Sequence, residues 1–298
     1  MCLAAFLSQA SADCTSLSII TWLWAEGCKK RRQPKEKALA SQIPYCGYSS
    51  GLRMINADSS SISSDFGSER TVWLGAIVWI LAVQFFVAQI VVQSAWVTPF
   101  SLTQNFISDL GNTACGPYPP DSGMYVCSPW HTWMNASFIL LGLIIIFGAV
   151  LVCKAFPPGG FRAAGLMLLA LAGAGNLAVG FFPEDVNITY HRLGAAAHFI
   201  LGNLGMVALG IALGHRRPAL AVYSLVSGLL GLLATMLFIS EHFLSMGIGG
   251  MERLAAYPLP FWLIVAGISL VCNVPARRPT RRRTGGAAKR AFFHSGSL

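Results

Sequence analysis

The sequence predicts an all-α protein, a polytopic membrane bundle of six transmembrane helices. Of the 298 residues 54% are hydrophobic and only 11% are charged, whereas soluble domains are about 25% charged. The mean hydropathy is +0.59. The apolar residues stand in blocks of about 20, which is the length that a helix needs to cross a hydrocarbon layer of ~30 Å.

Six such blocks follow one another along the chain. The last of them contains Pro258 and Pro260 near its start and is the weakest helix signal of the set. The expected spans are residues 72–97, 132–152, 163–182, 193–213, 219–240 and 255–274.

The basic residues predict the orientation. Beyond the first block, eleven Lys and Arg fall on one side of the predicted bundle and only Arg192 and Arg253 fall on the other. Because Lys and Arg concentrate in cytoplasmic segments, we expect a multi-pass protein of the cell membrane with both termini in the cytoplasm. The net charge of +9 is then local to the inner side, where the basic tail at 275–298 is expected to contact anionic lipid rather than nucleic acid.

The first 71 residues differ from the rest. They are rich in Ser and contain the basic run KKRRQPKEK at 29–37, and their four cysteines are too widely spaced for a zinc knuckle. We therefore expect three regions: a disordered cytoplasmic tail at 1–71, a six-helix domain at 72–274 and a basic cytoplasmic tail at 275–298. An alternative is that translation starts later, for example near Met54.

Two cysteines stand in the longest segment between predicted helices, residues 98–131. Cys115 and Cys127 enclose eleven residues rich in Gly and Pro. An outward loop faces an oxidising compartment, so these cysteines are predicted to form a disulfide. The alternative is a metal site formed by Cys115, Cys127 and His131, and it is disfavoured because loop ligands normally come as closer pairs.

Three segments carry a family resemblance: NFISDLGNTACG, CSPWHTWMNASFILLG and NLAVGFFPEDVNITYHRLGAAAHFILGN. With its SDLG segment at 108–111 and its FPED segment followed by His191, the chain resembles a bacterial, actinobacterial family of six-helix membrane proteins, domain-of-unknown-function family 998. The resemblance runs from about Trp73 to Val274. It implies the architecture of an integral membrane protein and no particular reaction.

The segment 182–198, FPEDVNITYHRLGAAAH, is the most polar interruption of the apolar sequence. One interpretation is a turn between helices, in which the region 185–187 caps the next helix. That interpretation accounts for Glu184 and Asp185 but not for His198, which lies about 10 Å deeper than His191 at 1.5 Å per residue. An ionisable side chain at that depth is a candidate for function.

We therefore predict one polar pocket at the outer ends of the helices. His191, just before the fourth predicted span, and His198, within it, are about 10 Å apart, too far to share one metal ion. A metal would need one of them together with groups from elsewhere, such as His131, Glu241 and His242, and neither a metal nor another cofactor is predicted. The expected members are Asp109, His131, Asp185, His191, His198 and Glu241.

Three classes of function fit this pattern. The first is a non-catalytic envelope protein that acts as a sensor, an assembly factor or a lipid-interacting partner. The second is an outer-leaflet hydrolase or transferase that acts on lipid or cell-envelope substrates through Asp109, His191 and His198. The third is a small-molecule transporter. No phosphate loop, dinucleotide fingerprint or GxSxG motif selects among these classes.

Overall fold

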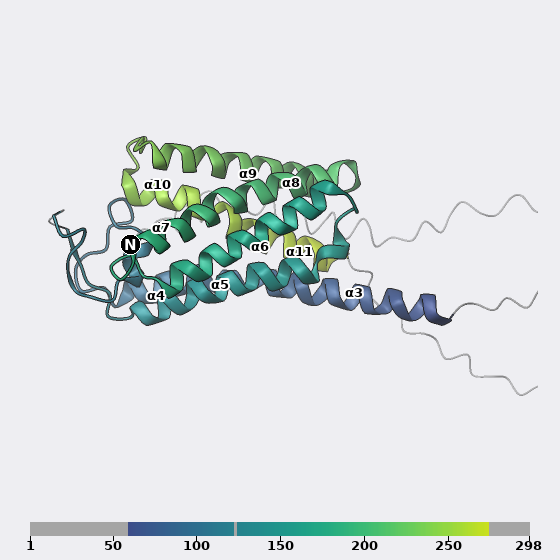
Figure 1. Ribbon diagram of the computed structural model, residues 1–298, viewed down its shortest axis with the longest axis horizontal. Helices are drawn as coiled ribbons and strands as arrows, with labels where there is room; N and C mark the ends of the chain where they lie inside the picture. The colour runs from purple at the N-terminus through teal and green to yellow at the C-terminus, as the bar shows by residue number, and fades with distance from the viewer. Residues whose placement is uncertain (1–58, 122–123, 274–298) are drawn as a thin grey trace, which may run out of the picture.

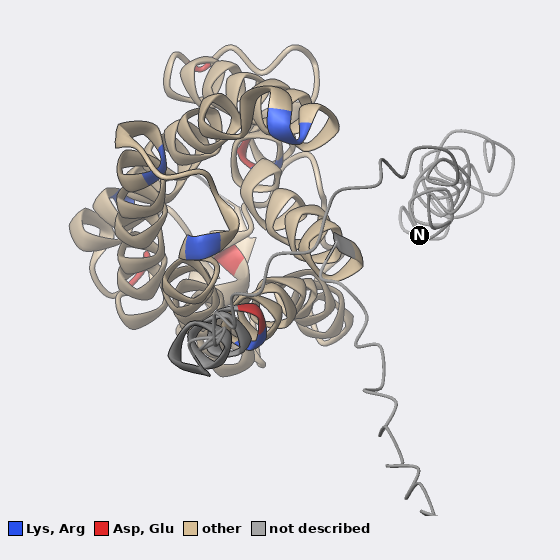
Figure 2. Ribbon diagram, turned by 90° about the vertical axis from the view of Figure 1, so that its right-hand side faces the viewer, with Lys and Arg blue, Asp and Glu red and all other residues tan. Residues whose placement is uncertain are grey.

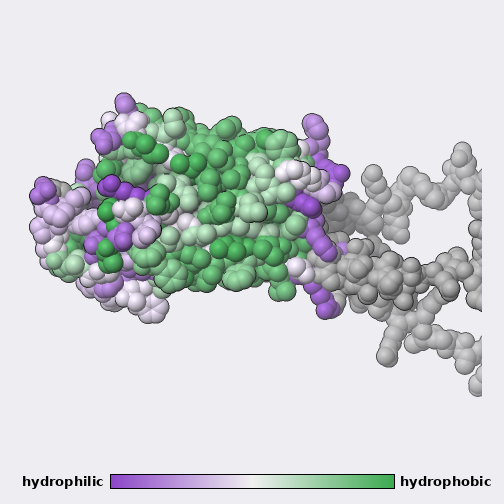
Figure 3. Space-filling view, viewed as in Figure 1, coloured by the Kyte–Doolittle hydropathy of each residue, from purple (hydrophilic) through white to green (hydrophobic). Residues whose placement is uncertain are grey.

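The computed structural model describes residues 59–121 and 124–273, with side chains from residue 69 to residue 272. Six helical spans in this part of the chain are long and apolar enough to cross a membrane. A wide apolar belt covers the face of the bundle seen in Figure 3, and polar residues gather at the two ends of that face. The predicted fold class, an all-α bundle of six transmembrane helices, is confirmed.

The helices run nearly parallel to one long axis (Figure 1). Each of the first, fourth and sixth spans is built from consecutive helical pieces. In chain order the helices are α3 (Ser59–Ile80), α4 (Val83–Ser94), α5 (His131–Leu151), α6 (Gly160–Phe181), α7 (Ile188–Ala196), the π-helical turn η3 (Ala197–Leu201), α8 (Gly202–Leu213), α9 (Pro218–Ile239), α10 (Gly247–Ala256) and α11 (Pro258–Asn273), with short 3₁₀ turns η1 (Ser108–Gly111), η2 (Cys153–Ala155) and η4 (Gly214–Arg216).

The six spans form a closed ring. Each span packs against the next one in the sequence, and α11 of the last span packs against α3 of the first. Figure 2, seen along the bundle, shows this ring and shows that most of the ribbon carries neither Lys, Arg, Asp nor Glu. Trp79 and Trp262 join the first and last spans with ring centroids 5.3 Å apart, and both side chains are fully buried.

Glycine allows α6 and α7 to approach closely. A Cβ atom added at Gly194 would lie 2.5 Å from the carbonyl oxygen of Gly175, and one added at Gly175 would lie 2.6 Å from the carbonyl oxygen of Gly194. Small residues at helix contacts in membranes permit such backbone approach. This contact fixes the start of the fourth span, which carries both histidines of the predicted pocket.

The sixth span begins earlier than the sequence suggested. It starts at Gly247 rather than at residue 255, because α10 leads into α11 at Tyr257. The backbone N–H of Tyr257 still donates to Arg253, and that of Phe261 donates to Tyr257, so the prolines interrupt the helix only locally. As a result Glu252 and Arg253, expected in a loop, lie on a helix and are buried.

We call the end of the bundle with residues 95–130, 182–187 and 240–246 the loop end, and the opposite end the tail end. At the loop end, strands β1 (Gly116–Pro117) and β2 (Tyr125–Val126) pair antiparallel. Cys115 and Cys127 flank them and form a disulfide with an S–S distance of 2.01 Å. The predicted disulfide is therefore present.

The two predicted tails fall largely outside the described residues. The tail at 275–298 lies entirely outside them, as do residues 1–58 of the tail predicted at 1–71. Helix α3 begins at Ser59, so the last residues of that predicted tail are helical.

Candidate functional site

Buried polar side chains gather at the loop end, although the surrounding helices are apolar. They come from three places: the loop that contains η1, the turn between α6 and α7 with the start of α7, and α10. The buried members are Asn105, Asp109, Asn112, Glu184, His191, Glu252 and Arg253.

Two carboxyl groups of this cluster meet directly. The side chains of Asp109 and Glu184 interact closely enough for a hydrogen bond to join them when one of them carries a proton, and their exposed fractions are only 2% and 7%. A carboxylate has no donor, so one of the two groups must carry a proton. We call Asp109 and Glu184 the acid pair.

The surroundings determine which partner keeps the proton. Burial raises the pKa of Asp109, while donors stabilise its charged form: Asn105 Nδ2 at 3.1 Å and the Phe106 N–H at 2.9 Å. Burial raises the pKa of Glu184 well above its ordinary value, and the charge on Asp109 raises it further. These surroundings favour Glu184 as the protonated donor and Asp109 as the acceptor.

A second contact joins the same two segments through other atoms. Nε2 of His191 lies 2.9 Å from Oγ of Ser108, and Nδ1 lies 2.9 Å from the carbonyl oxygen of Phe182. Because a carbonyl oxygen only accepts, Nδ1 carries the ring proton. In a neutral imidazole Nε2 then accepts the hydroxyl proton of Ser108.

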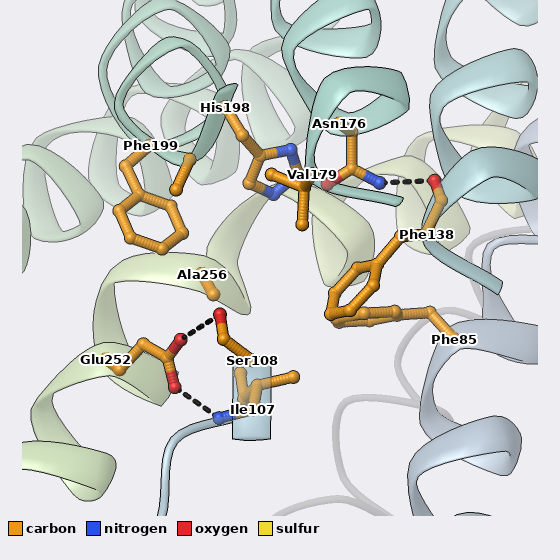
Figure 4. Close-up of a pocket in the computed structure, with 11 residues that line it drawn as sticks. Phe85, Ile107, Ser108, Phe138, Asn176, Val179, His198, Phe199, Glu252 and Ala256 are labelled. Atoms are coloured by element: carbon orange, nitrogen blue, oxygen red, sulfur yellow. Dashed lines mark hydrogen bonds between the residues drawn. The ribbon is translucent and has the colours of Figure 1, made fainter. Parts of the chain in front are cut away.

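Glu252 on α10 holds the loop from the other side. Its carboxyl group accepts the backbone N–H of Ile107 and lies 3.3 Å from Oγ of Ser108 (Figure 4). The neighbouring Arg253 donates from Nη1 to the carbonyl oxygens of Leu102, Asn105 and Gly249. Together these two side chains fasten residues 102–108 to α10.

Asp185 binds the disulfide-closed part of the loop. Its Oδ2 accepts the backbone N–H of Thr113 at 2.7 Å, the Thr113 hydroxyl at 2.9 Å and the backbone N–H of Ala114 at 3.0 Å. The cap of α7 is instead Asn187, which accepts from the Tyr190 N–H. The turn 182–187 therefore both caps a helix and anchors the loop.

Tyr118 adds a further bond between these segments. Its hydroxyl donates to the carbonyl oxygen of Glu184 at 2.9 Å. Burial, followed by the charges on Glu184 and Asp185, raises the pKa of Tyr118 to about 12, so the hydroxyl keeps its proton.

His198 lies beyond His191 along the fourth span, in the π-helical turn η3. It is 4% exposed, and its Nδ1 has no hydrogen-bond partner among the described residues. With Ser108, Asn176 and Glu252 it lines a small cavity whose other walls are apolar (Figure 4). The cavity has room for about one water molecule.

Two predicted pocket residues stand apart. His131 contacts the Ser128 carbonyl oxygen through Nδ1 at 3.0 Å. Glu241 is exposed in the turn after α9. Within the described residues, neither side chain hydrogen-bonds to Asp109, Asp185, His191 or His198, and the pocket of six residues stays a prediction.

Sequence reasoning missed Ser108, Glu184 and Glu252 as members of the site. Ser108 precedes Asp109 in the SDLG segment, and Glu184 precedes Asp185, so adjacency to predicted members was a usable signal. Glu252 and Arg253 form a charged pair directly before an apolar span. Among the described residues, no group of three or more His, Cys, Asp or Glu side chains is arranged to hold a metal ion.

The fold and this cluster define a multi-pass membrane protein, a ring of helices with a buried polar cluster at one end. The comparison with protein families places it more closely: residues 80–269 match the model described as "Protein of unknown function (DUF998)", and the chain belongs to that family. No curated protein and no solved structure matches the chain.

Proposed function

We propose that the protein is a sensor of external pH in the bacterial cell membrane, with the acid pair as its proton-binding element. The single observation that carries this proposal is the burial of the Asp109 and Glu184 carboxyl groups against each other. Of the envelope roles expected from the sequence, sensing is the one that a shared proton supports.

Orientation supports an external site. The segments that join helices at the tail end carry Lys154, Arg162, Arg216 and Arg217, whereas Arg253 of the loop end is buried. By the positive-inside rule the tail end, both termini and the anionic-lipid contact of the tail 275–298 are cytoplasmic, and the loop end faces outward. External protons then reach the acid pair from the loop side.

The mechanism follows from the charge of the pair. While Glu184 is protonated, it joins the turn 182–187 to η1. When the pH rises and Glu184 loses its proton, two buried carboxylates face each other without a proton between them, which costs free energy. The contact between η1 and the turn is then lost, and the loop between the first and second spans is held less tightly by the contacts that remain. Its position thus reports the external pH to a partner.

Other charges act on the pair. Arg253 favours the charged form of Asp109, and Glu252 disfavours the charged form of Glu184. The titratable or charged groups that interact with the pair itself are Tyr118, Glu252 and Arg253. Asp185 and Arg192 interact with Tyr118.

Hydrogen exchange of residues 101–128, corrected for the intrinsic pH dependence of exchange, tests the proposal. We compare about pH 5 with a pH above the native pKa of Glu184, and expect the wild-type loop to be protected at the first and to lose protection at the second, roughly tenfold for each unit by which that pKa exceeds its ordinary value. Glu184→Gln, which mimics the protonated group, should keep its protection at both values. Glu241→Gln, an exposed carboxylate of the same end, is the matched control and should behave as wild type. Equal wild-type protection at both pH values would refute the proposal.

The Ser108–His191 contact favours a second candidate function, that of an outer-leaflet hydrolase. It rests on different atoms from the acid pair.

A further inference from the structure

We infer that Ser108 is a nucleophile activated by His191, and that the protein hydrolyses carboxylic esters with apolar acyl groups. This activity goes beyond pH sensing, which requires no reaction at Ser108. The inference rests on the geometry of one side-chain pair and on the cavity next to it.

The hydrogen-bond directions are those that a base–nucleophile pair requires. The carbonyl oxygen of Phe182 fixes the proton of His191 on Nδ1, so the lone pair of Nε2 faces Oγ of Ser108 at 2.9 Å. A base that contacts the nucleophile and is itself held by a third group is the recurring arrangement of serine nucleophiles. Here a backbone carbonyl takes the place of the orienting carboxylate.

The hydroxyl of Ser108 has one proton and two acceptors nearby. The contact with His191 is 2.9 Å, and the contact with Oε1 of Glu252 is 3.3 Å. The shorter contact takes the proton. Oε2 of Glu252 accepts the backbone N–H of Ile107, and Oε1 is the more distant acceptor near the Ser108 hydroxyl, so Glu252 holds the chain at Ser108 in place from both oxygens.

Access and surroundings indicate the kind of substrate. His191 is buried, whereas Ser108 is partly exposed, so the nucleophile is the member of the pair that an outside molecule can reach. The cavity beside it is walled by Phe85, Phe138, Val179 and Phe199. An apolar acyl ester, as in membrane lipids, would reach Oγ of Ser108 from its partly exposed side and leave the cavity, which has room for about one water molecule, to the hydrolytic water.

The reaction balances with water as the only co-reactant. Oγ of Ser108 attacks the ester carbonyl carbon while its proton passes to Nε2 of His191. The bond to the leaving alcohol breaks, and that alcohol takes the proton from Nε2. A water molecule, for which the cavity beside Ser108 and His198 has room, then attacks the acyl-serine. His191 accepts its proton and returns it to Oγ of Ser108 as the carboxylic acid leaves.

The test uses the full chain in detergent, a fluorophosphonate reagent that labels activated serines, and p-nitrophenyl butyrate as the ester. Peptide mapping of the labelled wild-type protein should place the phosphonyl group on Ser108, and ester cleavage should be measurable. Ser108→Ala should abolish both. His191→Gln should slow labelling by at least about 100-fold, the usual contribution of a general base.

Ser101→Ala is the matched control, because Ser101 lies in the same loop and its Oγ contacts Thr103 rather than a histidine. We expect wild-type labelling from it. A label on another serine, no label on the wild type, or equal labelling rates in wild type and a folded His191→Gln variant would overturn the inference. If His191→Gln does not fold, the peptide map of the wild type decides alone. Glu184→Gln should still be labelled at Ser108, so failure of pH sensing and failure of this activity are distinguishable.

Discussion

Asp109, in the loop after the first span, and Glu184, in the turn after the third, are bound to each other through their carboxyl groups inside the protein. Two acids seldom meet in a buried place unless a proton lies between them. Around them, Asp185 holds Thr113 and Ala114, and His191 holds Ser108. The turn 182–187 and the start of α7 therefore bind the loop at several separate points, and only one of these depends on a shared proton.

This dependence predicts how stability changes with pH. The native pKa of Glu184 lies above its unfolded value of about 4.3, so the native state binds more protons than the unfolded state between the two values. The contribution of the acid pair is fully present below about pH 4.3 and is lost as the pH rises through the native pKa. Thermal unfolding in detergent should show a midpoint that falls over this window in the wild type and is flatter in Glu184→Gln. A wild-type midpoint that rises across the window would contradict the assignment.

The approach of α6 and α7 predicts a second effect. Gly194→Ala places a Cβ atom 2.5 Å from the carbonyl oxygen of Gly175, so the two backbones must separate. Overpacking of this kind costs about 1–3 kcal/mol, and it moves His191 away from Ser108. We expect a lower unfolding midpoint. The control is Gly160→Ala, where an added Cβ meets nothing within 4 Å, and it should leave the midpoint unchanged. Equal midpoints for the two variants would mean that the contact is not tight.

The disulfide predicts a third effect. Closing a loop of this length contributes roughly 3 kcal/mol in the chain-entropy model. Replacing Cys115 and Cys127 together by Ser should therefore raise hydrogen exchange across residues 113–128 while the six spans keep their protection. Peptide mapping without reduction should recover the linked pair from the wild type. Free thiols at both positions in freshly isolated membranes would contradict the structure.

The proposed topology predicts labelling from one side only. A cysteine placed at Arg217 should react with an impermeant thiol reagent only after the membrane is opened, because the tail end is cytoplasmic. A cysteine at the exposed Glu241 of the loop end should react in intact cells. The opposite pattern would reverse the orientation and place the acid pair inside the cell.

The sequence predicted the fold well because the bilayer limits what a chain can do. Long apolar blocks in a membrane protein form spanning helices, and all six spans appeared. The start of the sixth was placed at residue 255, where the apolar block with Pro258 and Pro260 begins, whereas the helical span begins at Gly247. That error hid Glu252 and Arg253, which lie on the extra helical turns.

The site was less accessible to sequence reasoning because its contacts join distant segments. Composition singled out Asp109 and His191 as polar residues among apolar neighbours, but nothing in the spacing showed that Asp109 would pair with Glu184 rather than Asp185. The exact partner depends on how the turn 182–187 is oriented against η1. Only the packing of α6 against α7 determines that orientation.

Infrared titration of the acid pair tests the central claim most directly. A carboxylic acid and a carboxylate absorb differently, so the protonated group can be followed as the pH rises. We predict an acid band that persists well above about pH 4.3, the ordinary value for Glu, in wild type and in Glu241→Gln, and that is weaker by one carboxyl group in Glu184→Gln. If the band disappears with the ordinary carboxyl groups, or is undiminished in Glu184→Gln, no proton is held between Asp109 and Glu184, and the pH-sensing account is wrong.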